Sequence, residues 1–209
     1  VGGLMTGKAG IVHLHMGDGE RGLELVRAAL ATTEIPARVF NPTHVNRRRG
    51  LFDEAMALAE RGATVDVTAF PVAEGEDAWS AADALARWLD AGLPPQRITV
   101  SSDAGGCLPV FDEEGRVRSM DVGAPGALVS TLAELVARGR PLEQVLPAFT
   151  SNVADLLRLE SKGRLHPGAD ADLVVLDERR AVHDVMARGR WHLRDRTAVV
   201  RGTFEGALA

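Results

Sequence analysis

The sequence contains little of what a secreted or membrane-bound protein needs. One cysteine in 209 residues excludes an internal disulfide framework and is consistent with a reducing compartment. No apolar run approaches the roughly 20 residues that a membrane helix requires. A charged and then apolar leader segment is also missing, so we expect a cytoplasmic protein that does not bind membranes.

Positive charge and aromatic residues are scarce as well. The chain has 24 lysines and arginines against 29 aspartates and glutamates, which gives a formal net charge of -5. Aromatic residues make up 4% of it and are not interleaved with a basic stripe, which argues against a nucleic-acid partner. The chain begins at Val1 rather than at a methionine, and its first residues resemble an internal segment, so we expect a fragment.

Segments with strand and helix patterns alternate over the first three quarters of the chain. The expected strands are residues 10–15, 38–40, 63–70 and 97–102. The expected helices follow Asp18, a candidate cap, and then cover about 50–61, 78–91, 124–138 and 141–157. Such alternation predicts parallel strands joined by helices. Four of these units make half of a (β/α)8 barrel or a small doubly wound sheet, and the pattern leaves both open.

The last fifty residues have a different pattern. Residues 163–172 are rich in turn-forming residues, and three short apolar runs follow them at 173–176, 182–187 and 197–200. This predicts a β-hairpin appendage to the larger α/β part. His166, His183 and His192 lie in this appendage, where we expect structural or exposed roles.

Metal-binding residue types occur at three of the four strand ends. His15 ends the first strand, His44 follows the second, and Asp103 follows the fourth, whereas the third strand end near Phe70 offers no comparable ligand. Imidazole nitrogens and carboxylate oxygens are the ligands of catalytic zinc sites. The loops after successive barrel strands converge on one mouth. The pattern therefore predicts a metal site, with Asp103 as a ligand and general base.

Each of these residues also has a simpler explanation. A histidine at a strand end is more often hydrogen-bonded than a ligand, and Asp103 could cap the following turn. His13 should point to the same side as His15, because side chains alternate along a strand. It is a weaker metal candidate that could instead be satisfied by a neighbour inside the barrel.

Two further residues are candidates for substrate binding. Arg47 lies three residues after His44, and its planar fork suits a substrate carboxylate in a way that lysine could not match. Arg48 and Arg49 are expected at the surface. Cys107 follows Asp103 by four residues without a visible basic partner, so we expect it to line the pocket rather than to act as a nucleophile.

Four motifs together resemble a known family. They are Gly10–Asp18, Pro42-Thr-His-Val-Asn-Arg47, Thr99-Val-Ser-Ser-Asp103 and Pro167-Gly-Ala-Asp-Ala-Asp-Leu-Val-Val-Leu176. In this order they resemble the amidohydrolase superfamily, and the Thr-His-Val-Asn-Arg run resembles its isoaspartyl (β-aspartyl) dipeptidase branch. The resemblance covers essentially the whole chain.

The resemblance implies a (β/α)8 barrel with two zinc ions and a small β-sandwich built from both chain termini. It places His15 and His44 on metal ligands after the fifth and sixth strands, and Asp103 on the eighth-strand ligand and general base. Arg47 falls on the arginine that holds the substrate's α-carboxylate. Cys107 falls where the family has a serine that contacts the substrate. The first-strand His-x-His pair and a bridging carboxylated lysine would lie upstream of this chain.

These implications define the expected protein. Residues 1–162 would form the second half of the barrel and residues 163–209 the C-terminal strands of the sandwich. The complete protein would be a homo-oligomeric, zinc-dependent hydrolase that cleaves the β-aspartyl peptide bond of dipeptides with a metal-activated water. The fragment alone would be inactive. Two alternatives stay open: an amidohydrolase that acts on a cyclic amide, as dihydroorotases and dihydropyrimidinases do, and a non-catalytic partial domain.

Overall fold

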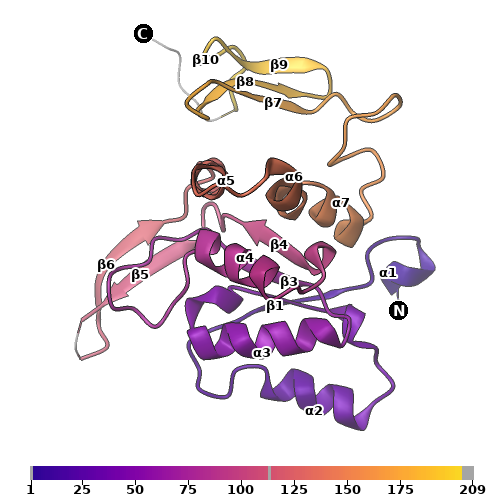
Figure 1. Cartoon of the computed structure of the whole chain (residues 1–209), viewed down its shortest axis with the longest axis vertical. Helices are drawn as coiled ribbons and strands as arrows, with labels where there is room; N and C mark the ends of the chain where they lie inside the picture. Colours follow the sequence, from indigo (N-terminus) through magenta and orange to yellow (C-terminus); the bar gives the residue numbers. More distant parts are fainter. Residues whose placement is uncertain (1, 113, 204–209) are drawn as a thin grey trace. The chain divides into compact units, whose positions relative to one another are not determined.

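The computed structural model describes residues 2–112 and 114–203, and it divides the chain into two compact units, Val1–Arg158 and Leu159–Ala209 (Figure 1). The first unit contains the strands β1 (Val12–His15), β2 (Phe40–Thr43), β3 (Val65–Thr68), β4 (Ile98–Ser101), β5 (Cys107–Phe111) and β6 (Val117–Val122). Its helices are α1 (Gly2–Met5), α2 (Glu24–Thr32), α3 (Arg49–Glu60), α4 (Ala81–Asp90), α5 (Ala127–Ala137), α6 (Leu142–Val145) and α7 (Ser151–Leu157). None of the helices in the described residues is long and apolar enough to span a membrane.

The first four strands form two parallel pairs. β1 pairs with β2 so that His15 lies opposite Thr43, and β3 pairs with β4 so that Thr68 lies opposite Ser101. The parallel pairing confirms what the alternation of strands and helices predicted. Because each pair is in register at its carboxyl end, polar residues from different strands come together there.

Side chains, rather than a backbone ladder, connect β2 to β3. These two strands contact each other without forming one continuous sheet. The Asn41 amide donates to the Thr64 carbonyl at 2.9 Å, and the Thr43 hydroxyl donates to Asp66 Oδ2 at 2.6 Å. All four residues are buried, so these hydrogen bonds satisfy groups that would otherwise be costly to bury.

An apolar core holds the strands against their helices. Trp88 of α4 and Phe52 of α3 are both fully buried, with ring centroids 6.5 Å apart. The Trp88 indole N–H donates to the Pro94 carbonyl at 3.1 Å. Val65 and Ile98, which lie opposite each other on β3 and β4, are also fully buried. This packing fixes the strands whose ends carry the candidate site.

Several predicted boundaries were wrong. β2 begins at Phe40 and runs to Thr43, so the first three residues of the expected loop after residue 40 belong to a strand. α2 has Leu23 at its N-cap without a side-chain cap, so Asp18 does not cap it. The helix expected at 141–157 is divided into α6, a 3-10 turn at Leu146–Phe149 and α7, since Pro147 within that segment lacks a backbone donor.

A β-hairpin that the sequence patterns did not predict follows Asp103. β5 and β6 pair antiparallel, with Cys107 opposite Val122 (Figure 1). The hairpin lies in the stretch between β4 and α5 where only a glycine-rich loop was expected.

The second unit is a small antiparallel sheet. It contains β7 (Leu173–Leu176), β8 (Val182–Ala187), β9 (Arg190–Arg194) and β10 (Thr197–Ala198), in the order β10-β9-β8-β7. β9 was not predicted. The division into a partial barrel at 1–162 and part of a composite sandwich at 163–209 stays a prediction.

The Pro-Gly-Ala-Asp-Ala-Asp motif has a structural role in this second unit. The Lys162 ammonium contacts the carboxylates of Asp170, at 2.9 Å, and of Asp172. The Ser161 hydroxyl also donates to Asp170 at 2.8 Å, and the backbone N–H of Arg188 donates to Asp172 at 2.7 Å. Asp172 thus ties the turn before β7 to the turn after β8, and Asp170 ties it to Ser161 and Lys162.

Candidate active site

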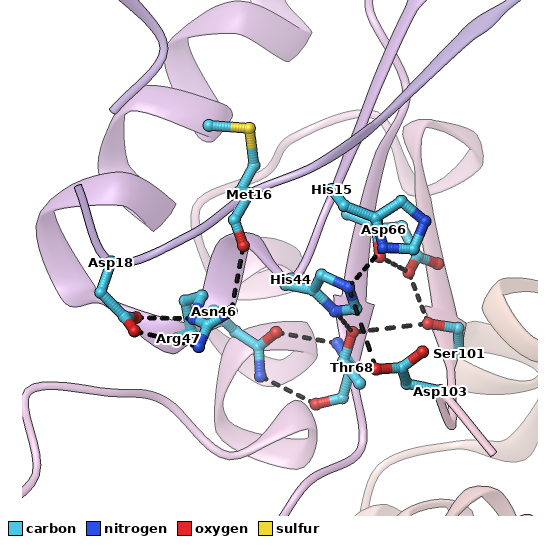
Figure 2. A network of polar contacts seen from close by, with 11 residues as sticks. His15, Met16, Asp18, His44, Asn46, Arg47, Asp66, Thr68, Ser101 and Asp103 are labelled. Atoms are coloured by element: carbon cyan, nitrogen blue, oxygen red, sulfur yellow. Dashed lines mark hydrogen bonds and ion pairs between the residues drawn. The ribbon is translucent and has the colours of Figure 1, made fainter. Parts of the chain in front are cut away.

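Three strand ends deliver the predicted metal ligands to one place. His15 is the last residue of β1, His44 directly follows β2, and Asp103 follows β4 by two residues. His44 Nε2 lies 3.0 Å from His15 Nδ1 and 4.0 Å from Asp103 Oδ2 (Figure 2). The structure therefore brings the three residues together around the His44 ring.

The backbone at two of these residues is left-handed. His44 has a φ of 62° and Asp103 a φ of 47°, a region that non-glycine residues seldom occupy. Two glycines leave room for Asp103 in this conformation. A Cβ on Gly106 would lie 2.5 Å from Asp103 Oδ2, and a Cβ on Gly123 would overlap the Asp103 carbonyl. Unfavourable backbone geometry of this kind is concentrated at functional sites.

The His44 ring is held on its other side by a hydroxyl. Its Nδ1 lies 2.8 Å from Thr68 Oγ1 at the end of β3. Burial lowers the pKa of His44, and nearby His15 and Arg47 lower it further, while the Asp103 carboxylate raises it. The balance favours the neutral imidazole, which is the form that binds metal ions.

The spacing of the two histidine nitrogens fits a zinc-like ion. Two nitrogen ligands on a tetrahedral zinc ion are about 3.3 Å apart, given zinc–nitrogen bonds of about 2.0–2.1 Å. The 3.0 Å between His15 and His44 is close to that value, and it also suits a hydrogen bond between the rings in the metal-free protein. Two imidazoles and a carboxylate form a donor set typical of zinc.

A second group of possible ligands lies in the smaller unit. Among the described residues, ligand atoms of His183, Asp184 and Asp195 all lie within 4.8 Å of one another. The Asp184 carboxylate already accepts the Asp195 backbone N–H at 2.8 Å and lies 3.0 Å from His183 and 3.9 Å from Arg194. These contacts, including one to a cation, explain the cluster without a metal ion.

His13 is side by side with His15 but has its own partner. The two ring centroids are 5.1 Å apart. His13 Nδ1 lies 2.6 Å from the Asn41 side-chain oxygen on β2. The structure thus gives His13 a hydrogen bond to a neighbouring strand, which was the simpler of the two interpretations of this residue.

Arg47 holds a carboxylate from its own chain. Its Nε lies 2.7 Å and its Nη2 3.1 Å from the two oxygens of Asp18, and its Nη1 donates to the Met16 carbonyl at 3.1 Å (Figure 2). Both partners lie just after β1, on the loop that follows His15. Only the Nη2 contact has hydrogen-bond geometry, so the guanidinium holds this carboxylate by one hydrogen bond and a close Nε contact beside the histidines.

Cys107 follows Asp103 by four residues in the chain. It opens β5 as an exposed free thiol. In the part of the chain that the structure describes, no hydrogen bond or ion pair connects it to His15, His44 or Asp103.

Sequence reasoning missed the polar residues beneath the histidines. Asp66, Thr68 and Ser101 lie on β3 and β4, and Asn46 fixes the end of β3 by bonding both the N–H and the carbonyl of Thr68 at 2.8 and 2.9 Å. A signal was present in the sequence: polar residues recur at every second position, 64, 66 and 68, of a segment that was expected to be a strand.

Comparison with known proteins identifies the family. A model of the amidohydrolase family matches residues 9–203. A β-aspartyl dipeptidase from Fervidobacterium islandicum AW-1, solved with the dipeptide β-Asp-Leu, is 36% identical over 98% of this chain, with a TM-score of 0.86. A second structure of β-aspartyl dipeptidase from the same organism is 34% identical over 98% of the chain, with a TM-score of 0.81.

A more distant structure shares the fold. The amidohydrolase from Thermotoga maritima MSB8 is 21% identical over 88% of this chain, with a TM-score of 0.58. The chain covers 53% and 51% of the two dipeptidase chains, and therefore spans about half the length of these relatives. The predicted fold class, half of a (β/α)8 barrel protein with C-terminal antiparallel strands, is confirmed, and so is the resemblance to the isoaspartyl dipeptidase branch. The chain belongs to the amidohydrolase family.

Proposed function

We propose that the complete protein is a metal-dependent hydrolase that cleaves the β-aspartyl peptide bond of dipeptides, and that this chain supplies half of its active site. The convergence of His15, His44 and Asp103 around one imidazole is the observation that carries the proposal. Its specificity is supported by similarity to the β-aspartyl dipeptidases over 98% of the chain.

Members of the amidohydrolase family generally use metal ions, and the donor set here fits zinc. We propose a binuclear zinc site in which His15, His44 and Asp103 are ligands. The remaining ligands, including a carboxylated lysine, would come from residues outside this chain. Bound zinc lowers the pKa of a water molecule to about 7 and polarises a carbonyl group.

The proton transfer and the orientation of the ligand atoms are assigned to residues of this chain. The Asp103 carboxylate accepts the proton of the attacking water and returns it to the amine that leaves, so no net proton is consumed by the residue. Its side chain is 32% exposed, which leaves it accessible to water and substrate. The neutral His44 ring keeps its Nε2 directed at the same space.

Arg47 is proposed to bind the substrate's α-carboxylate. Asp18 presents two carboxylate oxygens to the guanidinium, and its side chain is 66% exposed. An exposed ion pair of this kind contributes little stability, so a substrate carboxylate can take its place. Cys107 is proposed to contact the substrate from the start of β5. Assembly into a homo-oligomer and a cytoplasmic location stay predictions.

Hydrolysis of β-Asp-Leu by the full-length protein tests the proposal. Purified protein should contain divalent metal, lose activity after chelation and regain it with zinc, while α-Asp-Leu serves as the control substrate. Protein that binds no metal, or that binds it and leaves β-Asp-Leu uncleaved, contradicts the proposal. Cleavage of dihydroorotate in place of β-Asp-Leu would indicate the cyclic-amide alternative.

A further inference from the structure

A buried carboxylate beneath the histidines has no role in the chemistry described so far. Asp66 lies in the middle of β3 and is 4% exposed. Hydroxyl groups of Thr43 and Ser101 donate to its Oδ2, and that of Thr99 donates to its Oδ1, each at 2.6 Å. No ion pair to Asp66 is formed among the described residues, so hydroxyls alone compensate for its burial.

A chain of polar atoms leads from Asp66 to the His44 ring. Ser101 Oγ, which donates to Asp66, lies 3.5 Å from Thr68 Oγ1. Thr68 Oγ1 in turn lies 2.8 Å from His44 Nδ1. Figure 2 shows this chain running from Asp66 through Ser101 and Thr68 to the histidine.

The direction of these hydrogen bonds follows from Asp66. A carboxylate only accepts, and a hydroxyl has one hydrogen to donate. The hydrogen of Ser101 is directed to Asp66, so Ser101 can only accept from Thr68. The largest number of hydrogen bonds is formed when Thr68 donates to Ser101 and accepts from His44. This arrangement places the ring proton of His44 on Nδ1.

This direction does not depend on whether Asp66 is ionised. Two hydroxyls already donate to Oδ2, so an added proton would be placed on Oδ1. The Thr99 hydroxyl, which faces Oδ1, also lies 3.4 Å from the Val65 carbonyl. Thr99 can turn its hydrogen to that carbonyl and accept from a protonated Asp66, while Ser101 continues to donate to Oδ2.

We propose that Asp66 is a positioning residue that fixes the ring tautomer of His44 through Ser101 and Thr68. The proton is held on Nδ1, and the Nε2 lone pair faces His15 and Asp103. That this lone pair binds a metal ion rests on the proposed function. Groups that orient a ligating histidine typically change metal affinity about 10–100-fold when they are mutated.

Nitrogen NMR of the histidine ring tests the tautomer directly. The metal-free, full-length protein is labelled with ¹⁵N-histidine, the His44 signals are assigned with a His44→Gln variant, and spectra are recorded above the pKa of His44. Its Nδ1 should show the shift of a protonated ring nitrogen and its Nε2 that of an unprotonated one.

Three variants distinguish the relay, defined as the hydrogen-bonded chain Asp66–Ser101–Thr68–His44, from a general loss of packing in the core. Asp66→Ala removes the acceptor that directs the Ser101 hydrogen, and Ser101→Ala removes the intermediate hydroxyl. Both should move a substantial fraction of His44 to the Nε2–H tautomer. Thr99→Val, the matched control, removes a hydrogen bond to the same carboxylate outside the relay and should leave the tautomer on Nδ1. Ser101→Ala carries the test if Asp66→Ala does not fold.

Zinc affinity, measured by competition with a chelator, gives a second readout. Asp66→Ala and Ser101→Ala should weaken zinc binding roughly 10–100-fold, and Thr99→Val much less. A wild-type ring protonated on Nε2, or a tautomer that both relay variants leave unchanged, overturns the proposal. Failure to hydrolyse β-Asp-Leu would refute the proposed function, whereas the NMR result stands independently of activity.

Discussion

His44 Nε2 and His15 Nδ1 lie 3.0 Å apart although 29 residues separate them in the sequence. The parallel pairing of β1 and β2 produces this contact, since His15 is opposite Thr43 and His44 follows it directly. The contact therefore depends on strand register, because a slip by one residue would turn His15 away from His44.

Replacement of Asp103 tests its proposed role as general base. Asp103→Asn should lower kcat of the full-length enzyme by roughly 10²–10⁴-fold, the usual contribution of general acid–base catalysis. Asparagine tolerates the left-handed backbone, so the fold should persist. Asp53→Asn, on the exposed face of α3, is the control and should keep wild-type kcat. Steady-state kinetics with β-Asp-Leu and metal analysis provide the measurement, and an unchanged kcat in Asp103→Asn would exclude the role.

Replacement of Arg47 should affect substrate binding more than turnover. Arg47→Met should raise KM for β-Asp-Leu roughly 10–100-fold, because the substrate carboxylate loses a bidentate, charge-assisted partner. Arg47→Lys should recover only part of this loss, since an ammonium cannot reproduce the fork. The exposed Arg21→Met is the matched control. A KM that stays at the wild-type value in Arg47→Met would argue against carboxylate binding and would favour the cyclic-amide alternative.

The backbone conformation at His44 can be tested apart from its chemistry. His44→Gly and His44→Ala remove the same hydrogen bonds, but only glycine is relaxed at a φ of 62°. The left-handed cost for alanine, about 1–2 kcal/mol, exceeds the entropic cost of glycine, about 0.4–1 kcal/mol. His44→Gly should therefore be the more stable variant by roughly 0.5–1 kcal/mol in chemical denaturation.

A helical site provides the opposite control for this comparison. Ala57 is exposed in α3, so Ala57→Gly should lower stability by about 1 kcal/mol. If glycine were destabilising relative to alanine at both positions, the backbone at His44 would not be under strain.

Lys162 should make stability depend on pH in a defined direction. Hydrogen bonds from Lys162 lower the pKa of both Asp170 and Asp172, and these carboxylates raise the pKa of Lys162. Carboxylates with a lowered folded-state pKa contribute stability above their unfolded value of 3.8, and it is lost as the pH falls through the folded-state pKa. Lys162, whose pKa is raised, contributes stability below its unfolded pKa of 10.5. This contribution is lost as the pH rises through its folded-state pKa.

The Lys162→Met variant should lose this stabilisation over the pH range in which all three groups are charged. Its thermal midpoint should lie below that of the wild type between about pH 5 and 9, and the difference should shrink below pH 3.8 and well above pH 10.5. The exposed Lys8→Met serves as the control, with no such dependence. A difference that stays constant across the whole range would show that the three charges are not coupled.

Sequence patterns were sufficient for the parts of the site that depend on strand position. His15, His44 and Asp103 each come at the end of a recognisable apolar or β-branched run, and the ends of parallel strands meet. The extent of β2 was harder to predict, since Pro42 argues against a strand that pairs on both sides. In the structure β2 has a backbone ladder with β1, while its contacts to β3 are made through side chains.

Features that depend on partners from distant strands could not be predicted. Asp66 is tolerable at a buried position only because hydroxyls from β2 and β4 converge on it, and no local pattern specifies those distances. Asp18 similarly looked like a helix cap, but its stronger partner is Arg47, which is 29 residues away. In both cases a tertiary ion pair or hydrogen bond prevailed over a local preference.

The left-handed backbone at His44 and Asp103 restricts how the proposed metal site can be redesigned. Histidine, aspartate and asparagine are among the few side chains that accept positive φ readily. Cysteine or glutamate, the usual substitutions for changing a metal preference, would add a backbone cost of about 1–2 kcal/mol at either position. His15 lies in a regular strand, so metal selectivity is more readily altered there than at the other two proposed ligands.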